Sequence, residues 1–260
     1  MPPGGDLQEW FKSLPIFTRY WFGGTVLFTL LGRFGILQPA WLVLIWDYVV
    51  RSFHLWRPFT ALFYYPLTPQ TGFHFLINLY FLYNYSLRLE TGIFDGRPAD
   101  YLFMLLFNWV LCLLVAVFMN LPFLMDPMVL SVLYIWCQLN KDTIVSFWFG
   151  TQFKAMYLPW VLFAFNMIIA GGGVMELIGI LIGHMYFFLM FKYPQDFGGP
   201  SLLATPQILY DYFPNRRGGV HGYGQAPSAR GGGGGGNGGG GGGGGFGGGH
   251  AWGAGNRLGD

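Results

Sequence analysis

Six long apolar stretches, separated by polar or charged segments, dominate the pattern along the chain. They cover residues 20–37, 71–85, 101–119, 121–139, 155–169 and 171–191. A helix needs about 20 apolar residues to cross the hydrocarbon of a bilayer, so each stretch is predicted to be a membrane-spanning helix. The stretches at 71–85 and 155–169 are short, and a bilayer can thin locally to accommodate such spans. The pattern predicts an all-α polytopic membrane protein with six transmembrane helices.

Shorter elements are predicted outside these stretches. Between residues 6 and 14, apolar side chains recur at the spacing of one helical face, which indicates a helix that lies on the membrane surface or packs against the first span. Residues 40–50 are apolar but too few to cross, so a re-entrant or interfacial segment is predicted there. Residues 207–213 follow Thr205-Pro206 and are predicted to form a short helix near the membrane.

The positions of the basic residues predict the orientation. If both termini lie in the cytosol, eleven of the fourteen Lys and Arg residues fall on the cytosolic side, in agreement with the positive-inside rule. The exceptions are Arg33, Arg51 and Arg57, at the far end of the first span and in the loop that follows it. We therefore predict a multi-pass protein with both termini in the cytosol.

Composition agrees with this interpretation and excludes other classes of protein. Of the 260 residues, 53% are hydrophobic and only 10% are charged, whereas a soluble domain has about 25% charged residues. A net charge of +2 is too small to indicate nucleic-acid binding. Cys112 and Cys137 lie inside apolar runs without neighbours at metal-ligand spacing, so we predict buried thiols and no metal or other cofactor.

The chain is expected to divide into five segments. They are a cytosolic amphipathic segment at 1–19, the membrane domain at 20–191, a cytosolic juxtamembrane segment at 192–217, a disordered linker at 218–249 and a terminal motif at 250–260. The linker is so rich in glycine that it cannot form a core, which predicts a flexible tether. The terminal motif contains an aromatic, a basic and an aliphatic residue, which suggests a binding site for a protein partner. The alternative is a low-complexity sequence without a binding role.

Several motifs resemble those of the derlin family. They are Trp56-Arg57-Pro58, Leu79-Tyr80-Phe81-Leu82-Tyr83, Arg88-Leu89-Glu90-Thr91-Gly92, Phe94-Asp95-Gly96-Arg97-Pro98-Ala99-Asp100-Tyr101, Ser146-Phe147-Trp148-Phe149-Gly150 and the segment from Glu176 to His184. The resemblance is nearly continuous over about residues 7–220. Derlins are rhomboid-fold pseudoproteases, so it implies a rhomboid-like fold in the endoplasmic reticulum membrane. It also implies a part in moving misfolded proteins to the cytosol for proteasomal degradation.

The residues that a rhomboid protease needs for catalysis are missing. Active rhomboids use a serine in a Gly-x-Ser-Gly setting on the fourth span and a histidine base on the sixth, but here the motif is absent and the fourth span has only Ser131. The frame Glu176-x-x-Gly179-x-x-x-Gly183 has a glutamate in place of the base, and His184 lies two helical turns further on. We predict no catalytic residue, a packing or hydrogen-bonding role for His184, and close helix packing at Gly179 and Gly183.

Other candidate residues lie in the second span and the loop before it. Trp56 and Arg57 combine an amphipathic ring with a snorkelling cation, and the family resemblance implies that they engage clients and perturb the bilayer; loop anchoring is the alternative. His74 and Asn78 are one helical turn apart and either line a hydrated groove or form interhelical hydrogen bonds. Glu176, near the lumenal end of its span, is expected to face protein or a water-filled cavity.

The end of the chain resembles the short motif by which adaptors bind the N-domain of the valosin-containing AAA ATPase. The residues expected to bind are Trp252, Gly253, Gly255, Arg257 and Leu258. Trp252 and Leu258 would fill pockets, while Arg257 would add charge complementarity. Trp252 directly precedes the first glycine, where many adaptors have an intervening residue. This departure is expected to alter the affinity for the ATPase without abolishing binding.

Two functions are compatible with these features. The first is a channel or bilayer-thinning scaffold for retrotranslocation in endoplasmic-reticulum-associated degradation, with the ATPase, a membrane ubiquitin-ligase complex and misfolded clients as partners and with homo-oligomers expected. The alternative is a non-conducting trafficking scaffold that binds clients and ubiquitin ligases. An active protease would require turnover of a transmembrane substrate that depends on a serine of this chain.

Overall fold

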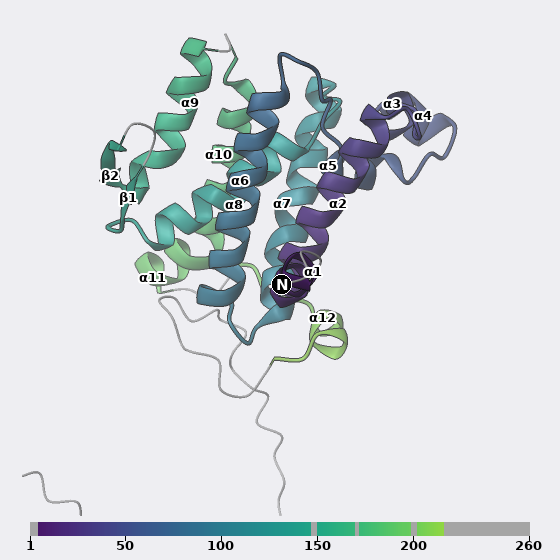
Figure 1. The fold of residues 1–260 in the computed structure, drawn as a ribbon. Coiled ribbons are helices and arrows are strands. Elements are labelled where there is room, and N and C mark those ends of the chain that lie inside the picture. The colour runs from purple at the N-terminus through teal and green to yellow at the C-terminus, as the bar shows by residue number, and fades with distance from the viewer. Residues whose placement is uncertain (1–4, 147–149, 170–171, 199–201, 216–260) are drawn as a thin grey trace, which may run out of the picture. The chain divides into compact units, whose positions relative to one another are not determined.

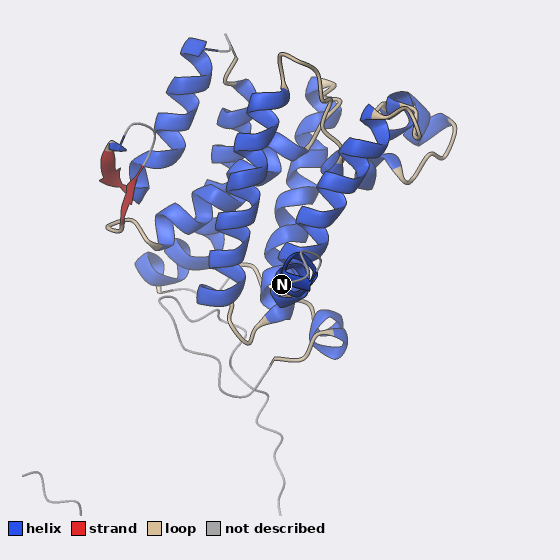
Figure 2. Ribbon diagram, viewed as in Figure 1, coloured by secondary structure: helices blue, strands red, loops and turns tan. Residues whose placement is uncertain are grey.

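The computed structural model describes residues 5–146, 150–169, 172–198 and 202–215, and these are predominantly helical, as Figure 1 and Figure 2 show. The chain divides into two units, residues 1–229 and 230–260, and all described residues belong to the first. The linker at 218–249 and the terminal motif at 250–260 lie outside the described residues.

A helix overlaps each of the six apolar stretches. These helices are α2 (Ile16–Arg33), α6 (Gly72–Arg88), α7 (Pro98–Met119), α8 (Met125–Leu139), α9 (Leu158–Ile169) and α10 (Val174–Phe187). A π-helical turn (Leu89–Ile93) follows α6, and another (Phe188–Lys192) joins α10 to α11 (Tyr193–Phe197). Within the described residues, Pro98–Met119 and Val174–Phe197 are long and apolar enough to cross a membrane, whereas α8 and α9 are apolar but shorter.

Short helices occupy the segments between and beside the long ones. α1 (Gly5–Ser13) is found where the apolar spacing predicts a helix, and α12 (Gln207–Tyr212) follows Pro206. The segment at 40–50 is divided between α3 (Pro39–Leu42) and α4 (Trp46–Arg51), and α5 (Arg57–Phe63) follows. The long segment before α6 therefore contains three short helices in place of the single re-entrant or interfacial segment expected at 40–50.

A small β-hairpin precedes α9 and departs from the all-α prediction. β1 (Ile144–Ser146) pairs antiparallel with β2 (Gln152–Lys154), with Ile144 opposite Lys154, and a 3₁₀ turn (Ala155–Tyr157) leads into α9. At the base of the hairpin, Lys154 Nζ lies 2.9 Å from Asp142 Oδ1. This hydrogen bond and the lysine charge hold the pKa of the Asp142 carboxyl below its usual range.

α8 lies at the centre of the core and packs most extensively against α10. The two backbones approach closely because α10 presents glycines. A Cβ added at Gly179 would lie 2.7 Å from the Pro127 carbonyl oxygen, and one added at Gly183 would lie 2.6 Å from that of Ser131. No side chain fits in either place without movement of a helix, so the two glycines hold α10 against α8.

A distant carboxylate stabilises the beginning of α2. Glu90 Oε2 accepts hydrogen bonds from the backbone N–H of Thr18 (2.8 Å) and from its hydroxyl (2.7 Å), and Glu90 Oε1 accepts from the N–H of Phe17 (3.0 Å). The first amides of a helix lack intrahelical partners and attract negative charge. Pro15 at the N-cap forms no side-chain hydrogen bond, so Glu90 supplies the cap from another part of the chain.

A second buried carboxylate joins the juxtamembrane segment to α7. Asp100 Oδ1, near the start of α7, accepts hydrogen bonds from the Thr205 hydroxyl (2.7 Å) and from the Tyr210 hydroxyl (2.6 Å). Asp100 is only 1% exposed. The segment that contains α12 is therefore held against the helical domain by hydrogen bonds to a desolvated carboxylate, which strengthens them.

Candidate functional site

α6 and α9 flank a groove in the side of the helical domain. α9 packs against α8 and α10 but hardly contacts α6, and two cavities of about 440 and 390 Å³ lie along the seam between them. Both cavities border Ile77. We call this feature the α6–α9 groove, and its apolar wall includes Leu76, Ile77, Tyr80, Phe81, Leu158 and Phe165.

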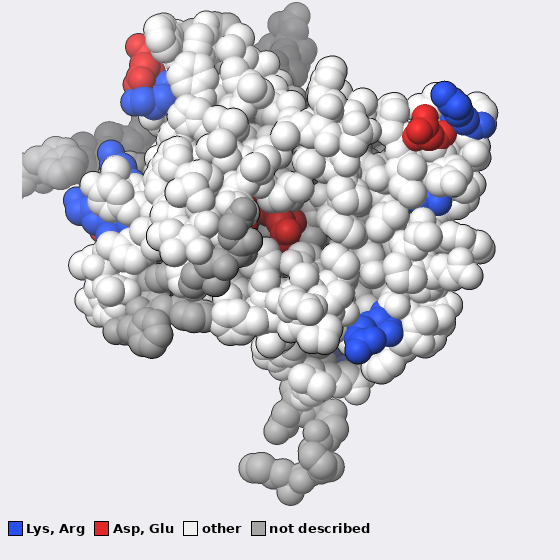
Figure 3. All heavy atoms as spheres, turned by 90° about the horizontal axis from the view of Figure 1, so that it is seen from above, with Lys and Arg blue, Asp and Glu red and all other residues white. Residues whose placement is uncertain are grey.

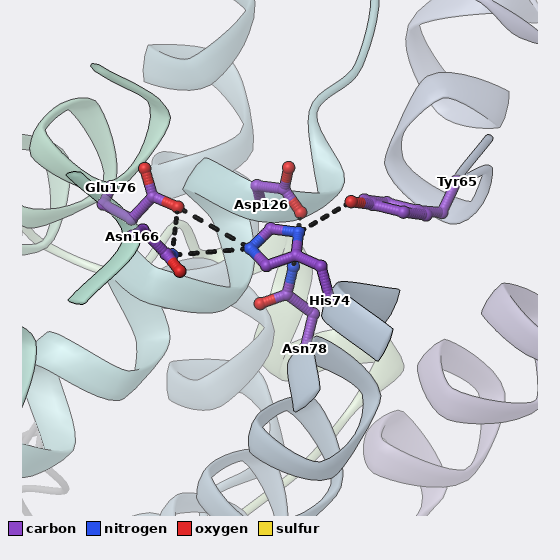
Figure 4. A network of polar contacts seen from close by, with 6 residues as sticks. All are labelled: Tyr65, His74, Asn78, Asp126, Asn166 and Glu176. Atoms are coloured by element: carbon purple, nitrogen blue, oxygen red, sulfur yellow. Dashed lines mark hydrogen bonds and ion pairs between the residues drawn. The ribbon is translucent and has the colours of Figure 1, made fainter. Parts of the chain in front are cut away.

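Polar side chains form a network at one end of the α6–α9 groove, as Figure 4 shows. The network consists of Tyr65 from the loop after α5, His74 and Asn78 from α6, Asp126 from α8, Asn166 from α9 and Glu176 from α10. The Asn78 amide donates to Asp126 Oδ1 (2.6 Å), and the Asn166 amide donates to Glu176 Oε1 (2.5 Å). These bonds connect α6 to α8 and α9 to α10.

His74 lies at the centre of the network and contacts both halves. Its Nδ1 is 2.7 Å from the Tyr65 hydroxyl and 3.5 Å from the Asn78 amide nitrogen. Its Nε2 is 3.4 Å from the Asn166 amide nitrogen and 3.8 Å from Glu176 Oε1. When Nδ1 accepts from Tyr65, the ring proton resides on Nε2 and faces the Glu176 carboxylate. Protonation of His74 would then add a positive charge between the two halves.

Two acidic residues line the α6–α9 groove in otherwise largely apolar surroundings. Asp126 and Glu176 both line the larger cavity, and within the described residues no Lys or Arg lines either cavity of the groove. Figure 3 shows acidic atoms near the centre of this face, where the described residues beside them are uncharged. Glu176 is only 8% exposed, and a buried charge is costly unless it is paired or hydrogen-bonded. The two asparagines and His74 provide that compensation.

Comparison with known proteins identifies the family. Residues 14–207 match the Der1-like family. Derlin-1 of Homo sapiens and Derlin-1 of Mus musculus are each 56% identical to this chain over 262 residues, which cover 98% of the chain and 99% of each relative. Derlin-1 of Drosophila melanogaster is 48% identical over 225 residues, or 86% of the chain and 91% of the relative. The chain belongs to the Der1-like family. The resemblance inferred from the motifs is thereby confirmed.

In this Der1-like chain, the positions expected to correspond to rhomboid catalytic residues have other partners. Ser131 is fully buried on α8, and its hydroxyl donates to the Met128 carbonyl of the same helix (2.8 Å). Glu176 belongs to the polar network. His184 Nδ1 forms a hydrogen bond of 2.8 Å with the Tyr134 hydroxyl. Among the described residues, no hydrogen bond connects Ser131 to a histidine, the contact that would activate a serine nucleophile.

The structure places Trp56 and Arg57 away from the α6–α9 groove, and the expectation of a snorkelling cation is wrong. Arg57 is 3% exposed, and its Nη1 donates to the carbonyls of Ala40 (2.7 Å) and Val43 (2.8 Å) while its Nε contacts His54 Nδ1 (3.1 Å). Backbone carbonyls of the folded loop satisfy the guanidinium, so it anchors the loop. Trp56 is 47% exposed and stacks on His54 at 4.5 Å between ring centroids.

Sequence reasoning singled out part of the network and missed the rest. His74, Asn78 and Glu176 stand out in the sequence as polar residues inside apolar stretches, and the structure brings them together. Asp126 and Asn166 carry the same signal at the start of the fourth span and near the end of the fifth. Tyr65 has no such signal because it lies in an aromatic loop. The five residues of the terminal ATPase-binding prediction lie outside the described residues.

Proposed function

We propose that this chain is a derlin of the endoplasmic reticulum membrane that helps misfolded proteins to move to the cytosol for degradation. In this proposal α2, α6, α7, α8, α9 and α10 are the six membrane-spanning helices, and both termini face the cytosol. Membership of the Der1-like family supports the role. The concentration of Lys and Arg on one side supports the orientation.

The observation that carries the proposal is the α6–α9 groove. A polypeptide in hydrocarbon must satisfy its backbone polar groups, so it is tolerated only where protein or water provides partners. The groove offers hydrogen-bonding side chains at one end and an apolar wall along α6. A client segment in the groove would therefore exchange lipid for a surface that matches both its apolar side chains and its polar groups.

Short helices around the groove support a thinned bilayer. α8 has 15 residues and α9 has 12, which at a rise of about 1.5 Å per residue gives lengths of about 22 and 18 Å. The hydrocarbon core of a bilayer is about 30 Å thick. A bilayer adjusts to shorter helices by local thinning. Thinning beside the groove would lower the cost of moving polar segments across.

The proposed role is non-proteolytic and depends on partners. Glu176 stands where the base of an active rhomboid is expected, and the chain has no Gly-x-Ser-Gly sequence. In the proposal, the terminal motif at 250–260 follows the glycine-rich linker and recruits the valosin-containing AAA ATPase, and the ATPase pulls clients from the cytosolic side. A membrane ubiquitin-ligase complex and further copies of this chain complete the assembly.

The test is the half-life of a misfolded endoplasmic-reticulum reporter in cells that lack derlins. The intact chain should shorten the half-life, whereas Ile77→Trp, which fills the α6–α9 groove, and a truncation before Gly231 should not. Val110→Trp is the matched control, because Val110 is exposed on α7 and lines none of the cavities described. An unchanged half-life with the intact chain, together with retained client binding, would favour the trafficking scaffold instead.

A further inference from the structure

An apolar groove separate from the α6–α9 groove runs between α1 and α2. Its volume is about 590 Å³, and its walls include Trp10 and Phe11 from α1 and Phe22, Val26, Leu27 and Leu30 from α2. Leu27 and Leu30 are 55% and 40% exposed. The walls are fixed by aromatic packing, because Trp10 meets Phe22 edge-on at 6.1 Å. Phe11 also lies over Gly23, where an added Cβ would be 2.9 Å from its ring.

Two basic residues adjoin the lining of this groove without being part of it, because Lys12 directly follows Phe11 in α1 and Arg19 precedes Phe22 by one helical turn in α2. Arg19 is on the same face of α2 as Phe22, Gly23 and Val26, one turn nearer the beginning of the helix. Its guanidinium donates to the backbone carbonyl oxygen of Lys12 (3.1 Å), which brings this guanidinium to the backbone of the last turn of α1. Within the part of the chain that the structure describes, neither side chain forms an ion pair with an acidic residue.

We propose that the α1–α2 groove binds an anionic phospholipid. An acyl chain lies along Val26, Leu27 and Leu30, and the phosphate contacts Lys12 and Arg19. The twelve residues from Arg19 to Leu30 span about 16 Å of helix, so the groove is long enough to hold much of an acyl chain. A zwitterionic headgroup would bring its own positive charge close to the two basic residues, which repel it. The occupant is therefore a lipid of net negative charge.

This inference rests on the proposed function for its setting. With the N-terminus in the cytosol, Lys12 and Arg19 lie at the cytosolic leaflet, where anionic lipids are concentrated. A basic residue near such a surface is worth about 1 kcal/mol, which corresponds to about fivefold in affinity. Two residues that share one phosphate therefore give a preference for anionic over zwitterionic lipid large enough to measure.

The experiment uses the full chain in phosphatidylcholine nanodiscs that contain brominated lipid. Bromine quenches nearby tryptophans, and the signal of Trp10 is the difference between the chain and a Trp10→Phe variant. Brominated phosphatidylserine should quench Trp10 at a roughly 25-fold lower mole fraction than brominated phosphatidylcholine, because each of the two basic residues contributes about fivefold. Lys12→Gln and Arg19→Gln should each reduce this preference about fivefold. Arg33→Gln, an exposed basic residue at the other end of α2, should leave it unchanged.

The other outcomes are distinguishable. Equal quenching by the two lipids, or an unchanged preference in the Lys12→Gln/Arg19→Gln double variant, would overturn the proposal. Val26→Phe, which fills the groove, should relieve the quenching of Trp10 by both lipids, and persistent quenching would place the lipid elsewhere. Each of these results leaves the proposed function standing. A failure of brominated lipid to quench any tryptophan would instead contradict the membrane setting on which the proposed function depends.

Discussion

The contact between α8 and α10 gives the sharpest prediction about stability. At Gly179 and Gly183 the positions of an added Cβ, 2.7 and 2.6 Å from backbone oxygens of α8, are well inside the 3.4 Å at which ordinary contact begins. The atoms in the way belong to the backbone of a buried helix, so no side-chain rotation can relieve the clash. Gly179→Ala and Gly183→Ala must therefore move α10 or distort it.

The expected cost combines two opposing effects. Overpacking of a close interface costs about 1–3 kcal/mol, whereas replacement of glycine by alanine inside a helix recovers up to about 1 kcal/mol. Each single variant should therefore lose about 1–2 kcal/mol of unfolding free energy, and the double variant should lose more than either.

Unfolding of the purified chain in mild detergent, followed by tryptophan fluorescence, measures these differences. Gly92→Ala is the matched control, because an added Cβ there has nothing within 4 Å, and its stability should be close to that of the unaltered chain. If Gly179→Ala and Gly183→Ala were as stable as Gly92→Ala, the two helices could not be as close as the structure has them, and the reasoning would be refuted.

Three further predictions concern the buried charges outside the α6–α9 groove. Glu90→Gln removes the negative charge at the beginning of α2 and should lower the free energy of unfolding by about 1 kcal/mol; the matched variant of exposed Glu9 should have no effect in the same assay. Arg57→Lys keeps the charge but loses the planar set of donors that reaches two carbonyls and a histidine, so proteolysis within the loop at 38–63 should accelerate, and an unchanged cleavage rate would contradict the anchoring role. Asp100→Asn weakens the acceptor for two hydroxyls of the juxtamembrane segment, so proteases should cut residues 202–215 faster, whereas Asp95→Asn, on an exposed side chain, serves as the unaffected control.

Much of the helical framework could be predicted from the sequence because long apolar runs are typical of membrane-spanning helices. The first and last residues of the helices could not be predicted in the same way. α2 begins at Ile16 rather than near residue 20, and the carboxylate that stabilises its first turn belongs to Glu90, 72 residues beyond Thr18. The hairpin at 144–154 was missed because strands of three residues leave too short an alternation to recognise.

The polar network could be predicted only in part, for a related reason. A polar residue inside an apolar run indicates that a hydrogen-bonding partner offsets the cost of its burial, but the sequence of the run does not identify that partner. Asn78 and Asp126 are 48 residues apart, and His74 and Asn166 are 92 apart. For Arg57, too, the sequence does not reveal the partners of the side chain, and here the result is a cation that is buried although exposure is expected. A cation near a membrane surface is expected to snorkel, and only the folded loop reveals the carbonyls of Ala40 and Val43 that retain it inside.

The contrast between two helix pairs explains how a rigid domain can keep an open side. α10 carries glycines where it meets α8, so those backbones approach until no side chain fits between them. α6 carries Phe73, Leu76, Ile77 and Tyr80 on the side toward α9, and bulky side chains hold helices apart unless a partner surface accepts them. Without a hydrophobic drive between helices in lipid, such a surface gains little by closing. The polar network then spans the gap at one end only, which leaves the rest of the α6–α9 groove open.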